Sequence, residues 1–249
     1  MKQKNFLLAL LLIVAGMQTL QAQTLKVWQN GKFDSYDVST VDSVQFVEPS
    51  YEWVDLDLPS GTLWATCNVG ANSPEEYGDY FAWGETTPKE SYTPENYQFY
   101  SYDTSTDDCW VTKYCQESDD GYNGFTDNLT ELLPEHDAAT ANWGSEWQMP
   151  SLDQIKELLN SSYTTTTWTT QNGVNGYKIS ANNGNSIFLP AAGIYGNRGL
   201  ALVGSNGDYW SRSLDKSFDA YYLNFYSSHV GWTSNNRCWG QPVRPVRKQ

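Results

Sequence analysis

Basic residues are scarce in this chain of 249 residues: 15 lysines and arginines stand against 29 aspartates and glutamates, and the formal net charge is −14. Proteins that bind nucleic acids or anionic membrane surfaces need clustered basic residues. The charge balance therefore argues against both kinds of partner. Histidine is scarcer still, because only His136 and His229 are present, far apart in the sequence. Neither comes with an evident Ser or Cys nucleophile of the kind that catalytic pairs need.

Long apolar runs are absent from the chain after its first residues. There, Lys2 and Lys4 precede an apolar run from Phe6 to Val14, and small and polar residues follow up to Ala22. This order is typical of a secretory signal peptide, here residues 1–22, and the run is too short to span a membrane. We therefore expect a mature chain without a transmembrane segment that is secreted, periplasmic or at the cell surface.

Cysteine is sparse, with four residues: Cys67, Cys109, Cys115 and Cys238. In an exported chain four cysteines allow three pairings. Cys109 and Cys115 are close enough in sequence to close a small loop, whereas Cys67 is equally consistent with a buried free thiol. The sequence leaves the pairing open.

Aromatic residues, Gly, Asn, Ser and Thr are abundant, which favours short strands and turns. Near the N-terminus Asn30-Gly31 separates two runs of alternating polarity, the strongest short signal for a β-hairpin, and a further strand is predicted at Val44–Val47. Residues 23–50 are expected to form a hairpin module and linker. They resemble a short module found just after the signal peptide of exported Bacteroidetes proteins, and a piece this small is not stable alone.

The main domain is predicted for residues 51–249. It begins with two short strands around the turn Pro59-Ser60-Gly61. From Gly84 to Leu132 the chain is acidic, aromatic and without clear periodicity, which indicates a long loop or insertion with a function. After Tyr163 it consists of short strands separated by turns rich in Gly and Asn. The expected strands lie within residues 176–180, 185–193, 207–213, 220–227 and 241–247.

Two helices are expected in this domain. Ser151 and Gln154 have the spacing of a capping box at a helix start. An apolar stripe follows it, formed by Leu152, Ile155, Leu158 and Leu159. A shorter helix is predicted to start at Pro134, with Glu135 and Asp137 in its first turn.

Several segments, in this order, resemble one family: VDLDLPSGTLWATCNVGA, YFAWGET, NWGSEWQMPS, NGYKIS, NSIFLPAAG, YWSRS, AYYLNF and VRPVR. Over residues 51–247 they are similar to the Fibrobacter succinogenes major paralogous domain, which is abundant in gut Bacteroidetes. That family resembles the C-type lectin-like fold in its formylglycine-generating-enzyme branch. The resemblance implies an α+β fold with small twisted antiparallel sheets, two flanking helices and long loops. It also implies that the first and last strands, WVDLDL and PVRPVR, pair with each other.

Metal sites suggested by the resemblance or by composition are not supported. Gln241-Pro242-Val243 lacks the carboxylate of the calcium-dependent sugar-binding motif, so that mechanism is rejected. A structural calcium site is the other hypothesis, because one loop gathers several oxygen ligands. Its members are Asp119, Asp120, Asn123 and Asp127. The loop does not match the spacing of an EF-hand, and a solvated acidic loop is the favoured interpretation. No cofactor is therefore expected.

Catalysis is not expected either. Enzymes of the related branch use a copper-binding Cys pair near the C-terminus, where this chain has Cys238 alone. Acidic residues are plentiful, but nothing singles out a pair suited to a glycosidase. A hydrolase ranks third among the possible functions, after a recognition protein and a structural or assembly protein.

The C-terminal region is the candidate ligand surface. The segments RSLDKSFDA and SSHVGWTSNNRCWG are predicted to be loops, and their Trp, Asn, Ser and Arg content is typical of binding loops. The side chains expected to point outward and bind a ligand are Arg212, Lys216, Phe218, Asp219, His229, Trp232, Asn235, Asn236, Arg237 and Trp239. The alternative for Trp232 and Trp239 is a place in the core, because Trp is usually well buried. Core positions are expected for Tyr209, Trp210, Tyr221, Leu223 and Phe225.

These features predict an exported, non-catalytic recognition protein that binds a glycan or a surface protein through its C-terminal loops. The Asn- and Tyr-rich C-terminal region also resembles the variable region of lectin-like targets of diversity-generating retroelements. The alternative is an envelope structural or assembly protein that docks through its N-terminal hairpin.

Overall fold

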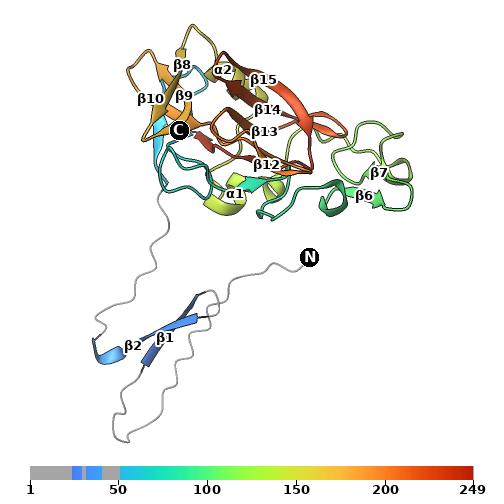
Figure 1. Ribbon diagram of the computed structural model, residues 1–249, viewed down its shortest axis with the longest axis horizontal. Helices are drawn as coiled ribbons and strands as arrows, with labels where there is room; N and C mark the ends of the chain where they lie inside the picture. The colour runs from blue at the N-terminus through green and yellow to red at the C-terminus, as the bar shows by residue number, and fades with distance from the viewer. Residues whose placement is uncertain (1–23, 30–31, 41–50, 249) are drawn as a thin grey trace, which may run out of the picture. The chain divides into compact units, whose positions relative to one another are not determined.

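The computed structural model describes residues 24–29, 32–40 and 51–248, and the chain divides into two compact units between residues 48 and 49. The first unit contains the predicted hairpin: β1 (Thr24–Gln29) pairs antiparallel with β2 (Lys32–Asp37), and a short 3-10 turn, η1 (Val38–Thr40), follows (Figure 1). The predicted signal peptide, the Asn30-Gly31 turn and the predicted strand Val44–Val47 lie outside the described residues.

The second unit begins and ends in one small sheet. β3 (Trp53–Asp55) and β4 (Thr62–Ala65) flank the predicted turn, and β17 (Val246–Lys248) is the last strand. The strand order is β17-β4-β3, so the expectation that the first and last strands pair directly is wrong. β4 lies between them because its TLWA segment is buried throughout, which suits a central strand covered on both faces. A second, two-stranded sheet pairs β5 (Tyr80–Phe81) with β16 (Gln241–Pro242).

The capping-box helix is confirmed as α2 (Leu152–Leu158). Ser151 Oγ accepts from the Gln154 amide, and the Gln154 side chain accepts from the Ser151 amide. The shorter helix begins later than predicted: residues from Pro134 form a 3-10 turn, η4 (Pro134–His136), and α1 (Ala138–Trp143) starts after Asp137, whose carboxylate caps the Thr140 amide. Among the described residues no helix is long and apolar enough to cross a membrane.

Antiparallel strands make up the rest of the unit, which is therefore α+β with few helices. One three-stranded sheet is β10-β9-β8, where β8 is Thr164–Gln171, β9 is Val174–Ala181 and β10 is Ser186–Pro190. β11 (Ile194–Gly196) pairs with β12 (Gly199–Ala201). The other three-stranded sheet is β13-β14-β15, where β13 is Asn206–Lys216, β14 is Asp219–Tyr226 and β15 is His229–Asn236.

Residues 84–132, predicted to be a long loop or insertion, are mostly exposed or partly buried but contribute several large side chains to the core. They contain η2 (Pro94–Asn96), the hairpin of β6 (Tyr100–Asp103) and β7 (Asp108–Val111), and η3 (Tyr122–Gly124). The β6–β7 hairpin lies at one end of the unit and β8–β10 at the other (Figure 1). Tyr92, Tyr97 and Tyr114 are buried, so the aromatic residues of this segment stabilise the fold.

The core has two parts on either side of the β13-β14-β15 sheet. Trp210 and Tyr222 belong to one part, and Tyr209, Leu223 and Phe225 belong to the other. Successive side chains on a strand point to opposite faces, and the two sets alternate in this way. The core prediction is confirmed for Tyr209, Trp210, Leu223 and Phe225, and Tyr221 is only partly buried.

All four cysteines are free thiols. Cys115 and Cys238 are buried, and Cys67 and Cys109 are partly exposed. Burial raises the pKa of the Cys109 thiol to about 11 and that of Cys238 to about 12. These thiols are therefore weak nucleophiles near neutral pH.

Asp208 in β13 is a buried acid with one side-chain partner, because Nδ2 of Asn224 in β14 donates to its Oδ1. Burial raises the pKa of Asp208 to about 6, and the bond from Asn224 opposes this only in part. An unfolded Asp has a pKa of about 3.9, so the folded protein binds this proton more tightly. The contribution of Asp208 to stability is therefore greatest below about pH 4 and is lost as the pH rises through about 6.

Asp208→Asn is expected to remove this pH dependence. At pH 8 the variant should be more stable than the wild type, by on the order of 2 kcal/mol, and at pH 4 the two should agree closely. Urea unfolding midpoints at both pH values measure the difference. Asp119→Asn, at an exposed site, is the matched control and should change little at either pH. A wild type as stable as Asp208→Asn at pH 8 would contradict the assignment.

Candidate functional site: the edge strand of the C-terminal hairpin

The segment predicted to be the main binding loop is instead the edge strand β15. It pairs with β14 from Tyr226↔His229 to Asp219↔Asn236, after a turn of two residues, and no other described strand pairs with it. The loop prediction is wrong because the sequence HVGWTSNN has only two large apolar residues, Val230 and Trp232. Its alternation is therefore weak, while its Gly, Ser and Asn content is typical of loops.

The outer edge of β15 has unpaired backbone groups. Tyr226 and His229 close the two-residue turn, and pairs in an antiparallel hairpin alternate between hydrogen-bonded and non-hydrogen-bonded. The amide and carbonyl groups of Val230, Trp232 and Ser234 therefore point away from β14. Within residues 51–248 no other segment donates or accepts hydrogen bonds at these groups. Such an edge is ready to pair with another extended chain.

Trp232 is the largest exposed side chain of this strand, with 47% of its surface accessible. In the register it lies opposite buried Leu223, and Lys156 Nζ of α2 is 6.0 Å from the centre of its ring. Val230, on the same face, packs partly against the core cluster that contains Ile155 and Leu158 of α2. The indole is thus fixed beside α2 at the rim of the core, with one side open to solvent.

The tip of the hairpin carries a second exposed aromatic group. The rings of Tyr226 and His229 stack, with centroids 5.3 Å apart and an interplanar angle of 29°. Both residues are exposed, and they lie on the opposite face of the hairpin from Trp232. The sequence does not single out Lys156 or Tyr226. Tyr226 could have been found from its place next to the Ser227-Ser228 turn, whereas Lys156 depends on how α2 packs.

Arg237 does not point outward, and its assignment to the ligand surface is wrong. Its side chain is fully buried, and its Nε donates to Tyr97 Oη at 3.1 Å. Its Nη1 donates to the carbonyls of Tyr114 and Ser217, and its Nη2 to the carbonyl of Lys113, at 2.6–3.0 Å. The guanidinium also lies 5.0 Å from the ring of Trp83. These contacts satisfy every nitrogen, which allows a charged group to be buried.

Two other predicted ligand residues, Asn236 and Trp239, make contacts that stabilise the fold. Asn236 Oδ1 accepts from Tyr100 Oη and from the Cys238 amide, both at 3.1 Å. Trp239 is partly buried against the core cluster, so the core alternative describes it better than the outward one.

The remaining predicted residues are distributed along the hairpin region. Arg212 is paired with Glu131 at 2.9 Å, and Phe218 packs against the ring of Tyr100. Asp219 and Asn235 are partly buried, and Lys216 is exposed. Burial, and then the neighbouring Asp215, raises the pKa of Asp219. Of the predicted residues, Lys216, His229 and Trp232 are thus the exposed ones.

The proposed calcium ligands do not converge. Both carboxylate oxygens of Asp127 accept from the backbone amides of Tyr114, Cys115 and Leu129. Across the described part of the chain, no three acidic, His or Cys residues are placed to hold a metal ion. Asp119 and Asn123 instead line a surface pocket near Trp110.

Comparison with known proteins finds no match for this chain: no family model, no curated protein and no solved structure is similar enough to be assigned. The site is therefore interpreted from its own residues and geometry. Its main features are the unpaired edge of β15 and the exposed indole of Trp232.

Proposed function

We propose that this chain is an exported, non-catalytic recognition protein that binds a protein ligand along the outer edge of β15, with Trp232 as the anchor. The observation that carries the proposal is the unpaired strand edge next to an indole that is 47% exposed. Its place of action is the periplasm or the cell surface. The scaffold is proposed to be C-type lectin-like and to belong to the major paralogous domain family that its motifs resemble.

A protein ligand fits this edge better than a glycan does. Backbone groups that alternate along a strand match those of an extended peptide, which adds one strand to the sheet. Sugar hydroxyls do not repeat with that spacing. Trp is also enriched among the residues that dominate protein interfaces, and here it lies next to Lys156, which suits an acidic or aromatic side chain on the ligand.

The proposal includes sequence diversification of the C-terminal segment, residues 212–239, among sibling chains. If the C-terminal segment varies among sibling chains, the variation should concentrate at exposed positions such as Lys216, His229 and Trp232. It should spare Arg237, whose burial leaves no freedom to vary. Alignment of sibling sequences over residues 212–239 checks this, and variation at Arg237 as frequent as at Trp232 would contradict it.

The N-terminal hairpin supports a second candidate function, that of an envelope assembly protein. Within the described part of the first unit, Val27 and Tyr36 are each 47% exposed on one face of the hairpin, and Phe33 is 45% exposed on the other face, so both faces of this small element present apolar groups. Deleting residues 25–47 should then abolish localisation and leave ligand binding at β15 intact.

Trp232→Ala should weaken ligand binding by about 30-fold or more, because the loss of a central Trp typically costs about 2 kcal/mol. Stability should change by less than about 1 kcal/mol, since the side chain is half exposed. Ser234→Pro should also abolish binding, because it removes an outward amide while keeping the pairs with β14. Ser234→Ala is the matched control and should bind normally.

The probe for this test is a displayed library of random linear peptides, selected on the mature chain, residues 23–249. Selected peptides should bind saturably and compete with one another. A parallel arm uses a glycan array, with calcium and then with a chelator. Peptides that bind Ser234→Pro as well as the wild type, or ligands found only on the glycan array, would reject strand addition.

A further inference from the structure

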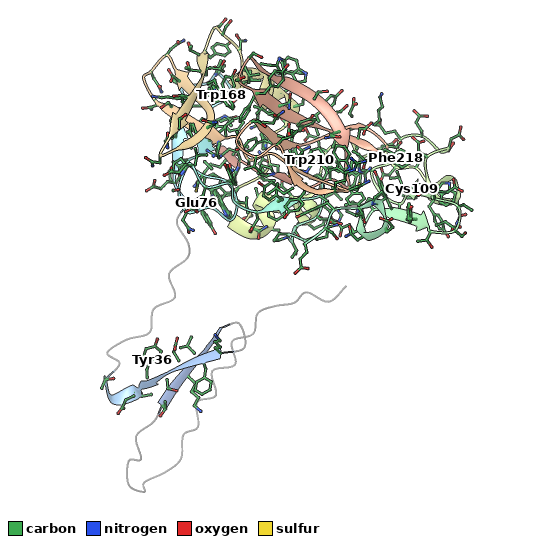
Figure 2. The ribbon with its side chains drawn as sticks, viewed as in Figure 1. Tyr36, Glu76, Cys109, Trp168, Trp210 and Phe218 are labelled. Carbon is green, nitrogen blue, oxygen red and sulfur yellow. The ribbon has the colours of Figure 1, made fainter. Side chains whose placement is uncertain are left out.

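A pocket with aromatic and polar walls lies between β7 and η3, in the segment that was expected to be a solvated acidic loop. Its volume is about 350 Å³, near the lower end of the roughly 300–1,000 Å³ typical of small-molecule sites. The lining residues are Trp110, Ser118, Asp119, Gly121, Tyr122, Asn123 and Gly124. β7 lies at the end of the unit where Figure 2 labels Cys109, which comes directly before Trp110 in the sequence.

Backbone hydrogen bonds and one close backbone approach hold the pocket wall in place. The Val111 amide donates to the Asp120 carbonyl at 2.8 Å, and the Gly124 amide donates to the Gly121 carbonyl at 2.9 Å. A Cβ atom at Gly121 would lie 1.8 Å from the Phe125 carbonyl oxygen, so only glycine fits there. Asp127 anchors the next part of the loop through its bonds to backbone amides. The walls are therefore largely formed before any ligand binds.

Two rings supply the apolar part of the pocket. Trp110 is partly buried and Tyr122 is 46% exposed, and their centroids are 6.4 Å apart at an angle of 64°. The two rings thus pack edge to face against each other, and a ligand in the pocket lies beside this pair rather than between the rings.

Three polar side chains complete the lining: Ser118, Asp119 and Asn123. Each is exposed, and none has a side-chain hydrogen bond to another described residue. They supply a hydroxyl, a carboxylate and an amide, which together can donate and accept.

We propose that this pocket is a binding site for a neutral sugar. The C–H face of a pyranose packs on the ring of Tyr122 or Trp110, and its hydroxyls bond to Asp119, Asn123 and Ser118. The carboxylate of Asp119, with Asp120 next to it and Glu117 two residues before it in the sequence, disfavours anionic sugars through like-charge repulsion.

Ammonium ligands are the competing chemistry, because two rings and a carboxylate also attract cations. The size of the pocket favours the sugar. So do the Asn123 amide and the Ser118 hydroxyl, because an ammonium group cannot accept the hydrogen bonds that they donate, whereas a sugar hydroxyl can. The site is independent of the strand edge proposed above, and it assigns the glycan and the protein ligand to different surfaces.

The test is isothermal titration calorimetry on the mature chain with neutral gluco-, manno- and galacto-oligosaccharides, with sialyllactose and choline as comparison ligands. At least one neutral sugar should bind saturably, and sialyllactose and choline should not. Tyr122→Ala and Asp119→Ala should each weaken the binding about tenfold or more. Tyr122→Phe should retain most of it, because the ring remains.

Two matched controls separate this site from the rest of the chain. Phe125→Ala removes an aromatic ring of similar exposure on the same loop, outside the pocket lining, and should bind the sugar normally. Trp232→Ala should also bind it normally, even where it abolishes peptide binding. The proposal is overturned if no neutral sugar binds, if choline binds instead, if Tyr122→Ala binds as well as the wild type, or if Trp232→Ala loses the sugar.

Discussion

Arg237→Ala is expected to lower the free energy of unfolding by about 4 kcal/mol, a large part of the roughly 5–15 kcal/mol that stabilises a typical domain. The substitution leaves the carbonyls of Lys113, Tyr114 and Ser217 without their donor. A buried polar group left unsatisfied costs about 1–3 kcal/mol, and the cavity adds to that. Urea unfolding followed by tryptophan fluorescence gives the measurement.

Two variants make the Arg237 result specific. Arg237→Lys should recover only a small part of the loss, because a single ammonium cannot reach acceptors that three guanidinium nitrogens reach. Arg198→Ala, at an exposed arginine, should change stability by less than about 0.5 kcal/mol. If Arg237 belonged to a ligand surface, its alanine variant would be as stable as that of Arg198, and that outcome would contradict the buried role.

Local signals in the sequence predicted the local structure well. The capping box of α2 depends on Ser151 and Gln154, three residues apart, and the structure forms both of its bonds. The strands on either side of Pro59-Ser60-Gly61 and the core residues Tyr209, Trp210 and Leu223 were also predicted correctly. In each case the information lies within a few residues of chain.

Features that depend on distant partners were not predicted. The sequence around Arg237 predicts a binding loop, because Asn, Arg and Trp are typical of such loops. Its acceptors Tyr97, Lys113 and Tyr114 lie more than 120 residues away in sequence. No pattern in the sequence connects them. The same reason explains the pocket at Trp110, which exists only because η3 folds back beside β7.

Composition was also a poor guide to burial in residues 84–132. Their composition predicts a long loop or insertion, but Tyr92, Tyr97 and Tyr114 pack in the core, and the first two donate to backbone carbonyls outside the segment. Tyr97 Oη, for example, donates to the Trp83 carbonyl at 2.6 Å. A tyrosine can be buried at little cost when its hydroxyl finds a partner. The acidic side chains, in contrast, lie mostly at the surface of the same segment.

Arg244→Ala is the second substitution expected to have a large effect, with a loss of about 3–4 kcal/mol. Arg244 is buried in the motif VRPVR, and its Nε donates to Asn68 Oδ1 at 2.8 Å. Its Nη1 donates to the carbonyls of Ala65 and Thr66, and its Nη2 to that of Phe188, at 2.9–3.2 Å. One side chain thus joins the segment before β17 to the end of β4 and to β10.

The same motif contains its own control. Arg247 lies three residues later, with its Nη2 3.0 Å from Glu146 and its guanidinium 4.6 Å from the ring of Trp53. The side chain of Glu146 is 71% exposed, so Arg247→Ala should cost only about 1 kcal/mol. Equal losses in the two alanine variants would show that Arg244 acts as a surface arginine. A loss at Arg244 that is several times larger would establish that the motif holds the two ends of the second unit together through its buried arginine.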